Sequence, residues 1–182
     1  MGVRMATIDD VAAMSYIHSQ TWKKAYVNYF SAEYLESISD EGWIPLFSRA
    51  IREKAHDAAI YEDSGKITGT ITFGKARKNN YLDDSSTNSD NLTVSENLSE
   101  AEIISLYVLP EYWSTGQGFE LMKFAVENLK NQGFQRCFLW VIRDNQRATG
   151  FYNRFGFKST GELITVMLAG KPLIEEKYVY NF

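Results

Sequence analysis

The segment LYVLPEYWSTGQGFELM (residues 106–122) combines the features of a strand, a tight turn and a helix. Its β-branched and aromatic residues stop at Pro110, which has no N–H to give to a β-ladder. Gly116 and Gly118 then leave the main chain bare, and apolar residues follow at helical spacing. The first N–H groups of such a helix have no acceptor within it. The sequence therefore predicts an anion-binding turn, and a pyrophosphate is the anion that we expect.

A plain turn before a helix can carry the same glycines, so this spacing alone leaves two interpretations open. Two other phosphate-binding loops are excluded. The chain has no GxxxxGK[ST], and no GxGxxG at the first strand–helix turn. A second element one strand downstream, NQRATGFYNRFGF (residues 145–157), favours the ligand-binding interpretation.

Composition limits the class of protein. A chain of 182 residues with 45% hydrophobic residues is long enough for one domain with a full core. A net charge of -4 gives no basic face, so we expect no nucleic-acid partner. Cys137 is the only cysteine, which excludes an intrachain disulfide and a Cys-rich zinc site, and we expect no metal. Without a membrane-length apolar run or a signal segment, we expect a cytoplasmic protein with no membrane partner.

Hydrophobic periodicity gives the element order β-αα-βββ-α-β-α-ββ, one mixed α/β domain without repeats. FQRCFLWVI (134–142) is apolar on both faces and is predicted as a central strand. The other predicted strands are VRMAT (3–7), a hairpin over 58–74 with DSGK as its turn, AEIISLYVL (101–109), and two strands around AGKP (169–172). The predicted helices lie at 9–26, 118–132 and 145–155, together with a helical region at 31–55 in which Ser31 caps the segment 31–39 and Pro45 lies in the first turn of a further helix at 41–55.

Capping residues define the ends of these helices. Asp9 or Asp10 is expected to cap the first one, and Asp144 or Asn145 the last one. Gly133 is expected to close the helix that follows the glycine turn. The segment 77–99 is polar and acidic, and it is predicted as a long loop.

Together these motifs resemble the GCN5-related N-acetyltransferase (GNAT) family, of the bacterial small-molecule type. Its signature is a strand, [QR]-x-x-G-x-[GA], a helix, a strand, and a short helix N-x-x-A-x-x-x-Y-x-x-x-G-F. The first part corresponds to LYVLPEYWSTGQG, and the second to Asn145, Ala148, Tyr152, Gly156 and Phe157. The resemblance implies one GNAT domain over 1–182, with a mostly antiparallel sheet of about seven strands flanked by helices. It places acceptor-side helices at about 9–55 and an acetyl-CoA-binding core at about 101–158.

The resemblance also implies how acetyl-CoA, the cosubstrate, would bind. The pantetheine arm would pair as an extra strand beside a bulge at Leu106 and Tyr107, and Asn145 would contact it. The N–H of Val108 would act as an oxyanion donor to the thioester. Main-chain amides would cradle the pyrophosphate, and they belong to Trp113, Ser114, Thr115, Gly116, Gln117 and Gly118.

One departure from the signature concerns the pyrophosphate turn. Trp113 stands where the family has Gln or Arg, and Ser114 and Thr115 replace a small-plus-basic pair. Because the contacts there run through backbone N–H groups, we expect weaker or reshaped coenzyme binding rather than its loss.

Attack of an amine on a thioester needs a base and an acid. Glu102 is the predicted base and a residue near the acceptor, and the alternative is a solvated strand-end carboxylate. Tyr152 is the predicted acid for the leaving thiolate and also a coenzyme contact, and the alternative is a core tyrosine that packs against Phe151 and Phe155. Cys137 is interpreted as a packed thiol.

Neither histidine is predicted to be the base. His18 is interpreted as a helix-surface or partly buried side chain, and His56 is assigned to a polar loop.

The sequence gives less information about the amine that accepts the acetyl group. Trp22 and Tyr26 belong to a Trp-x-x-Ala-Tyr pattern that is similar to that of spermidine/spermine acetyltransferases, and they are predicted to line the acceptor pocket. An acidic cluster would suit a polyamine, or is only a solvated loop. It consists of Asp83, Asp84, Asp90, Glu96 and Glu100.

The sequence leaves three functions open. The first is acetylation of a small primary amine, with a polyamine as the specific candidate. The second is acetylation of protein N-termini or lysines, and the third is a non-catalytic coenzyme-binding module. A homodimer through the last two strands is a further hypothesis.

Overall fold

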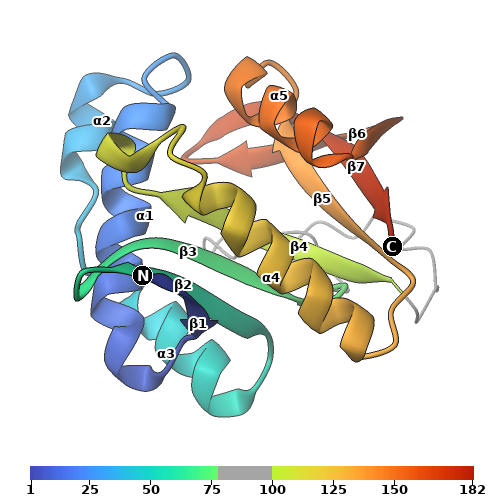
Figure 1. Ribbon diagram of the computed structural model, residues 1–182. Coiled ribbons are helices and arrows are strands. Elements are labelled where there is room, and N and C mark those ends of the chain that lie inside the picture. The colour runs from blue at the N-terminus through green and yellow to red at the C-terminus, as the bar shows by residue number, and fades with distance from the viewer. Residues whose placement is uncertain (78–99) are drawn as a thin grey trace. The chain divides into compact units, whose positions relative to one another are not determined.

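The computed structural model describes residues 1–77 and 100–182. This part of the chain forms a mixed α/β fold, as predicted, with seven strands and five α-helices (Figure 1). The strands are β1 (Gly2–Met5), β2 (Asp57–Asp63), β3 (Lys66–Lys75), β4 (Ala101–Val108), β5 (Arg136–Ile142), β6 (Lys158–Leu168) and β7 (Lys171–Asn181). The helices are α1 (Val11–Ala25), α2 (Ala32–Ser37), α3 (Ile44–Glu53), α4 (Gln117–Asn131) and α5 (Gln146–Phe155), with two short 3-10 helices, η1 (Ile8–Asp10) and η2 (Pro110–Tyr112).

The sheet has the strand order β1-β2-β3-β4-β5-β7-β6, with β4 parallel to β5. The pairs β1–β2, β2–β3, β5–β7 and β6–β7 are antiparallel, so the predicted mostly antiparallel sheet and the central place of β5 are confirmed. The predicted order differs in one place, because three helices precede β2 rather than two. Ser31 Oγ accepts from the N–H of Tyr34 at 3.2 Å and starts α2 as a separate short helix, which ends where Ile38 becomes extended.

Both hairpin turns follow their sequences. The turn between β2 and β3 has φ of 52° at Ser64 and 81° at Gly65, and the turn between β6 and β7 has 50° at Ala169 and 73° at Gly170. Two consecutive residues with positive φ are the type I′ geometry, whose twist matches that of the strands. The DSGK and AGKP turns are thus confirmed.

The chain divides into two compact units. The first contains Met1–Gly74 and Ile103–Asn128, and the second contains Lys75–Glu102 and Leu129–Phe182. The predicted coenzyme-binding core at about 101–158 contributes residues to both units. Among the described residues, no helix is long and apolar enough to cross a membrane.

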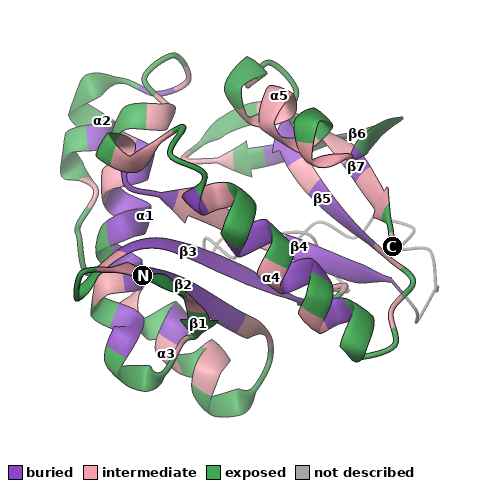
Figure 2. Ribbon diagram, viewed as in Figure 1, coloured by how far each residue is buried: buried purple, intermediate pink, exposed green. Residues whose placement is uncertain are grey.

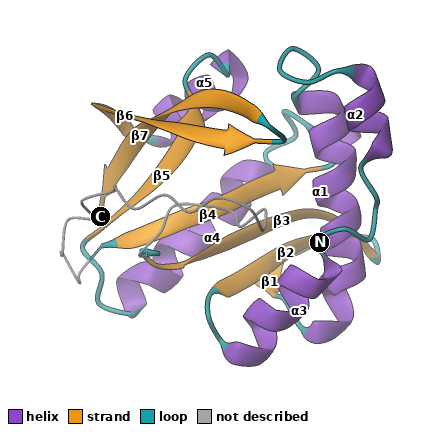
Figure 3. Cartoon of the chain, turned by 180° about the vertical axis from the view of Figure 1, so that it is seen from behind, coloured by secondary structure: helices purple, strands orange, loops and turns teal. Residues whose placement is uncertain are grey.

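In the first unit, helices cover both faces of the strands. Helices α1 and α3 pack on one face of β2, where Met14, Phe47 and Ile60 share a buried apolar cluster. Helix α4 lies on the other face (Figures 1 and 3). It packs closely, because a Cβ built on Gly69 of β3 would lie 2.8 Å from the Leu121 side chain. Glycine at this position therefore lets α4 approach the sheet.

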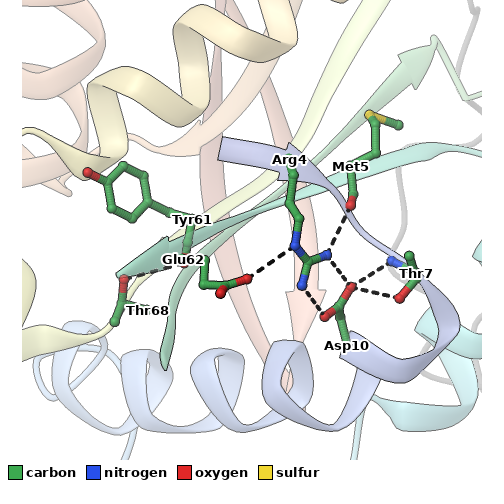
Figure 4. Close-up of polar contacts among 7 residues, drawn as sticks. All are labelled: Arg4, Met5, Thr7, Asp10, Tyr61, Glu62 and Thr68. Atoms are coloured by element: carbon green, nitrogen blue, oxygen red, sulfur yellow. Dashed lines mark hydrogen bonds and ion pairs between the residues drawn. The ribbon is translucent and has the colours of Figure 1, made fainter. Parts of the chain in front are cut away.

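An arginine on β1 joins three elements of the first unit (Figure 4). Arg4 donates to both carboxylate oxygens of Asp10 at 2.8 Å and to Glu62 on β2 at 3.2 Å. Asp10 also accepts from the N–H of Thr7 at 2.7 Å. The hydrogen bonds from Arg4 and Thr7 lower the pKa of Asp10 from 3.8 to about 2. Asp10 does precede α1, as predicted, but its side chain bonds backwards to Thr7 and Arg4 instead of capping the helix.

In the second unit, α5 lies on one face of β5, β7 and β6 (Figure 3). Its ends are as predicted, since Asn145 Oδ1 accepts from the N–H of Ala148 at 3.1 Å and Gly156 ends the helix with φ of 120°. Figure 2 shows buried residues along β5. Cys137 of that strand is fully buried, and burial raises the pKa of its thiol to about 12. The packed-thiol interpretation is therefore confirmed.

The Arg4–Asp10 pair gives a prediction for stability. Replacing Arg4 by Met leaves Asp10 buried without its cation, and we expect the free energy of unfolding at neutral pH to fall by about 1–3 kcal/mol. Because the pKa of Asp10 is lowered on folding, the stabilisation is complete above 3.8 and is lost as the pH falls towards about 2. Urea unfolding of parent and variant over this range should show the difference shrinking. Glu62→Gln, which alters an exposed pair, should change stability by less than about 1 kcal/mol. A pH-independent loss would instead assign the effect to packing of the Arg4 stem.

Candidate active site

One threonine on β3 holds both sides of the turn between β4 and α4. The carbonyl of Thr68 accepts from the N–H of Leu109 at 2.9 Å, and Thr68 Oγ1 donates to Gln117 Oε1 at 2.8 Å. Thr68 is fully buried and Gln117 is 5% exposed, so water competes little for these bonds. The turn is therefore fixed to the sheet before any ligand binds.

Trp113, a residue of the same turn, stabilises it through hydrogen bonds. Its Nε1 donates to the carbonyl of Val108 at 2.7 Å, and Thr21 Oγ1 donates to the same oxygen at 3.1 Å. The N–H of Trp113 donates to Pro110 at 3.2 Å, so this amide is engaged within the turn and the open row of donors begins one residue later than predicted. The residue that departs from the signature thus acts on the turn through its indole ring.

The N–H groups of residues 114–118 have no hydrogen-bond acceptor among the residues that the structure describes. Gly116 has a φ of 94°, and a Cβ there would meet nothing within 4 Å. The side of the turn at Gly116 is therefore open. A row of unpaired donors that leads into a helix N-terminus is suited to bind a phosphate group.

Three aromatic residues of the first unit meet at their polar atoms. Trp22 Nε1 donates to the Tyr107 hydroxyl at 3.1 Å, and the Tyr26 hydroxyl lies 3.4 Å from that of Tyr107. Trp22 is 5% exposed, whereas Tyr26 and Tyr107 are half-buried. The predicted acceptor residues Trp22 and Tyr26 are thus brought together, and Tyr107 of β4 joins them.

His18 is buried more deeply than predicted. Its ring is 4% exposed and lies 4.3 Å from the ring of Tyr107 and 4.8 Å from that of Phe47, measured between centroids. Burial lowers its pKa to about 3. His18 is therefore a neutral packing residue at neutral pH and does not act as a base.

In the second unit, Glu102 is buried in an ion pair. Its side chain is 1% exposed, so the alternative of a solvated strand-end carboxylate is wrong. Oε1 accepts from the Arg77 guanidinium at 2.6 Å, and Oε2 accepts from Arg77 Nε and from the Arg77 N–H, both at 3.1 Å. Both oxygens are thus engaged by one residue. The role of Glu102 as a base stays a prediction.

The predicted acidic cluster has one described member. Glu100 is 8% exposed and forms an ion pair with Arg136, so it is not a solvated loop carboxylate. The other members, Asp83, Asp84, Asp90 and Glu96, lie outside the described residues.

Other predicted site residues keep roles that remain predictions. Tyr152 is half-buried on α5, and its ring contacts those of Phe151 and Phe157 with centroids 5.4 and 5.8 Å apart. Asn145 uses its side-chain oxygen to cap α5. Leu106 is half-buried in β4. The bulge predicted at this point in β4 likewise stays a prediction.

Sequence reasoning missed two charged residues of the second unit. The sequence places Arg77 at the start of the acidic loop and gives Glu175 no special position in its predicted strand. Alternation along IEEKYVY (174–180) could have placed Glu175, Lys177 and Val179 on one face of the strand. No pattern in the sequence around Arg77 indicates that its side chain pairs with Glu102.

A family model described as "Acetyltransferase (GNAT) family" matches residues 19–157, well over half of the chain. The chain belongs to the GNAT family of acetyltransferases. The family and the enzyme class predicted from the sequence are thereby confirmed.

The GNAT chain is similar to named relatives along nearly its whole length. It is 28% identical over 158 residues to the spermidine N(1)-acetyltransferase of Thermoplasma acidophilum, and the match covers 86% of this chain and 87% of that protein. The PaiA N-acetyltransferase of T. acidophilum, solved in complex with coenzyme A, has a TM-score of 0.67 at 21% identity, with 100% of both chains covered. The ribosomal-protein-alanine N-acetyltransferase of Brucella melitensis has a TM-score of 0.71 at 16% identity, also with 100% of both covered. At these identities the two structures show the GNAT fold alone.

Substitution of Gly116, with Gly133 as the matched control, tests whether the turn binds the coenzyme. Gly116 and Gly133 have φ of 94° and 91°, and a Cβ at either one would meet nothing within 4 Å. Replacing either by Ala should lower the free energy of unfolding by a similar amount, about 1–2 kcal/mol, because L-residues are strained at positive φ. Gly116→Ala should in addition weaken coenzyme A binding about tenfold or more, equivalent to about 1.4 kcal/mol, by distorting the row of donors.

Urea unfolding and calorimetric titration with coenzyme A measure the two effects separately. Equal loss of affinity in Gly116→Ala and Gly133→Ala would mean that the turn does not bind the coenzyme.

Proposed function

We propose that this GNAT protein transfers an acetyl group from acetyl-CoA directly to a primary amine of a small molecule, and that a polyamine such as spermidine is the acceptor. The observation that carries the proposal is the turn at residues 113–118. Its N–H groups from 114 to 118 lack acceptors in the described chain, and it is already fixed by Thr68 and Trp113. A single acetyltransferase domain over 1–182 in the cytoplasm is part of the proposal, and so is a homodimer through β6 and β7.

Acetyl-CoA fits this turn on chemical grounds. Its pyrophosphate needs several donors at short range, and the open N–H groups at the start of α4 supply them without a charged side chain. Bound acetyl-CoA would supply an activated acyl group. The chain would contribute orientation, and the N–H of Val108 would be the oxyanion donor.

Two observations support a cationic small-molecule acceptor. The T. acidophilum relative that matches most of the chain is named a spermidine N(1)-acetyltransferase. The half-buried rings of Tyr26 and Tyr107, with Trp22 behind them, form an aromatic surface that would attract an alkylammonium group through its ring faces.

An acceptor panel tests the proposed activity. With acetyl-CoA and the full chain, spermidine should release coenzyme A and yield acetylspermidine by mass spectrometry. Coenzyme A alone, at a hundred times its dissociation constant, should stabilise the protein by about 2.7 kcal/mol. Peptides with N-terminal alanine or internal lysine are the comparison acceptors. Faster turnover of a peptide would move the protein to the protein-acetylating class, and binding without turnover of any amine would make it a coenzyme-binding module.

Tyr152 is proposed as the acid that protonates the leaving thiolate. Tyr152→Phe should lower kcat by about a hundredfold and leave the dissociation constant of coenzyme A nearly unchanged. Tyr180→Phe is the matched control, because Tyr180 belongs to the ring cluster of Phe155 and Phe157 and should keep the parent kcat. Stopped assays at saturating spermidine give both rates. A Tyr152→Phe variant as fast as Tyr180→Phe would return Tyr152 to a packing role.

A further inference from the structure

Strand register in the second unit places several charged and polar side chains on one face of the sheet. Glu102 of β4 lies beside Phe138 of β5, and Phe138 pairs with Val179 of β7. Neighbours in register share a face, and so do alternate residues along a strand. Trp140 and Ile142 therefore face the same side as Glu102, together with their β7 partners Lys177 and Glu175.

A contact supports this assignment. Lys177 Nζ lies 4.5 Å from the ring centroid of Phe138 and 5.9 Å from that of Trp140, so the three side chains are on one side of the sheet. We name the surface formed by Glu102, Phe138, Trp140, Lys177 and Glu175 the Glu102 face.

The two carboxylates of this face differ in their partners. Glu102 is held by Arg77 through both oxygens, in charge-assisted hydrogen bonds. The half-buried Glu175 side chain has no hydrogen bond or ion pair among the described residues. A carboxylate that is partly buried and unengaged is free to take up a proton without loss of a contact.

The pKa of Glu175 also differs from that of an ordinary glutamate. Burial raises its pKa to about 7, Arg77 opposes the rise and Glu102 adds to it. The strand neighbours of Glu175 are Ile142 on β5 and Ile164 on β6, which carry no charge. The remaining charged side chain of this face is Lys177, and it pairs with Glu162 of β6 at 3.4 Å.

Trp140 contributes to the Glu102 face a polar atom that is unpaired within the described part of the chain. Trp140 Nε1 is buried without an acceptor among the described residues. A buried donor left unpaired costs about 1–3 kcal/mol, so an acceptor atom from a ligand or water at this position is favourable.

We propose that Glu175, rather than Glu102, is the residue that accepts the proton from the acceptor ammonium. The proposal rests on the proposed acetyltransferase function. It assigns the base to Glu175 in place of Glu102, which is the ion-pair partner of Arg77.

The proton steps balance as follows. The ammonium gives one proton to the Glu175 carboxylate, which later releases it to solvent. The free amine nitrogen then attacks the thioester carbon, so that a C–N bond forms and the C–S bond breaks with its electron pair on sulfur. Tyr152 gives its proton to that sulfur, and the second nitrogen proton restores the Tyr152 hydroxyl. A base with a pKa near neutrality combines a large ionised fraction with useful basicity.

The kinetic test uses the full chain with acetyl-CoA and spermidine. Glu175→Gln should lower kcat about a hundredfold. It should also remove the acid limb of the plot of kcat/KM against pH, which is the fall in kcat/KM below about pH 7. Glu175→Asp should keep that limb at reduced rate. Glu176→Gln is the matched control, because Glu176 is the next residue on β7, faces the other side and accepts from Ser159. An unchanged acid limb in Glu175→Gln would overturn the proposal.

A second measurement separates this proposal from the choice of acceptor. Carbon-13 NMR of the Glu side-chain carboxyls, with the Glu175 signal assigned by its absence in Glu175→Gln, should show a titration near pH 7 that shifts when spermidine is added. Titration at the ordinary glutamate value of about 4 would overturn the proposal. If the parent binds coenzyme A but does not acetylate spermidine, the proposed acceptor fails, and the NMR titration still decides the protonation of Glu175.

Discussion

The structure of the site depends on the N–H groups at 114–118, which need a hydrogen-bond acceptor that the described chain does not supply. In the free protein, water can fill this role at an exposed turn, and a phosphate fills it better because its charge interacts with the start of α4. The cost of ordering the turn is met before binding, since Thr68 and Trp113 fix it to β3 and β4. The proposed recognition of the coenzyme at this turn would therefore depend on the backbone, which the surrounding side chains hold in place.

The departure from the family signature at Trp113 concerns a side chain and not the backbone donors of the turn. Trp113 replaces Gln or Arg, yet its indole bonds to the carbonyl of Val108 and leaves the amides after it unengaged. A site built on N–H groups allows many side chains, provided that φ at Gly116 stays positive. The Glu102 face is different, because its two carboxylates differ in their surroundings: Arg77 pairs with Glu102, whereas burial raises the pKa of Glu175.

Much of the local structure could be predicted because it depends on residues that are near in sequence. The hairpin turns at Ser64 and Ala169 and the Asn145 cap follow from preferences for φ and for side-chain acceptors within a few residues. The central position of β5 follows from its apolar character on both faces. Sequence reasoning fails where a partner is distant: it counts Glu100 as a loop charge although Glu100 pairs with Arg136, and it does not show that Glu102 pairs with Arg77.

The sequence by itself determined the order of elements, the glycine turn and the family, because each rests on spacing along the chain. Only the tertiary structure decided what each ionisable group can do. The proton affinity of a carboxylate depends on desolvation and on charges nearby in space, and those are set by strand register. Glu102 and Glu175 have the same chemistry in the sequence, and they differ because the fold brings Arg77 into contact with one and leaves the other beside Ile142 and Ile164.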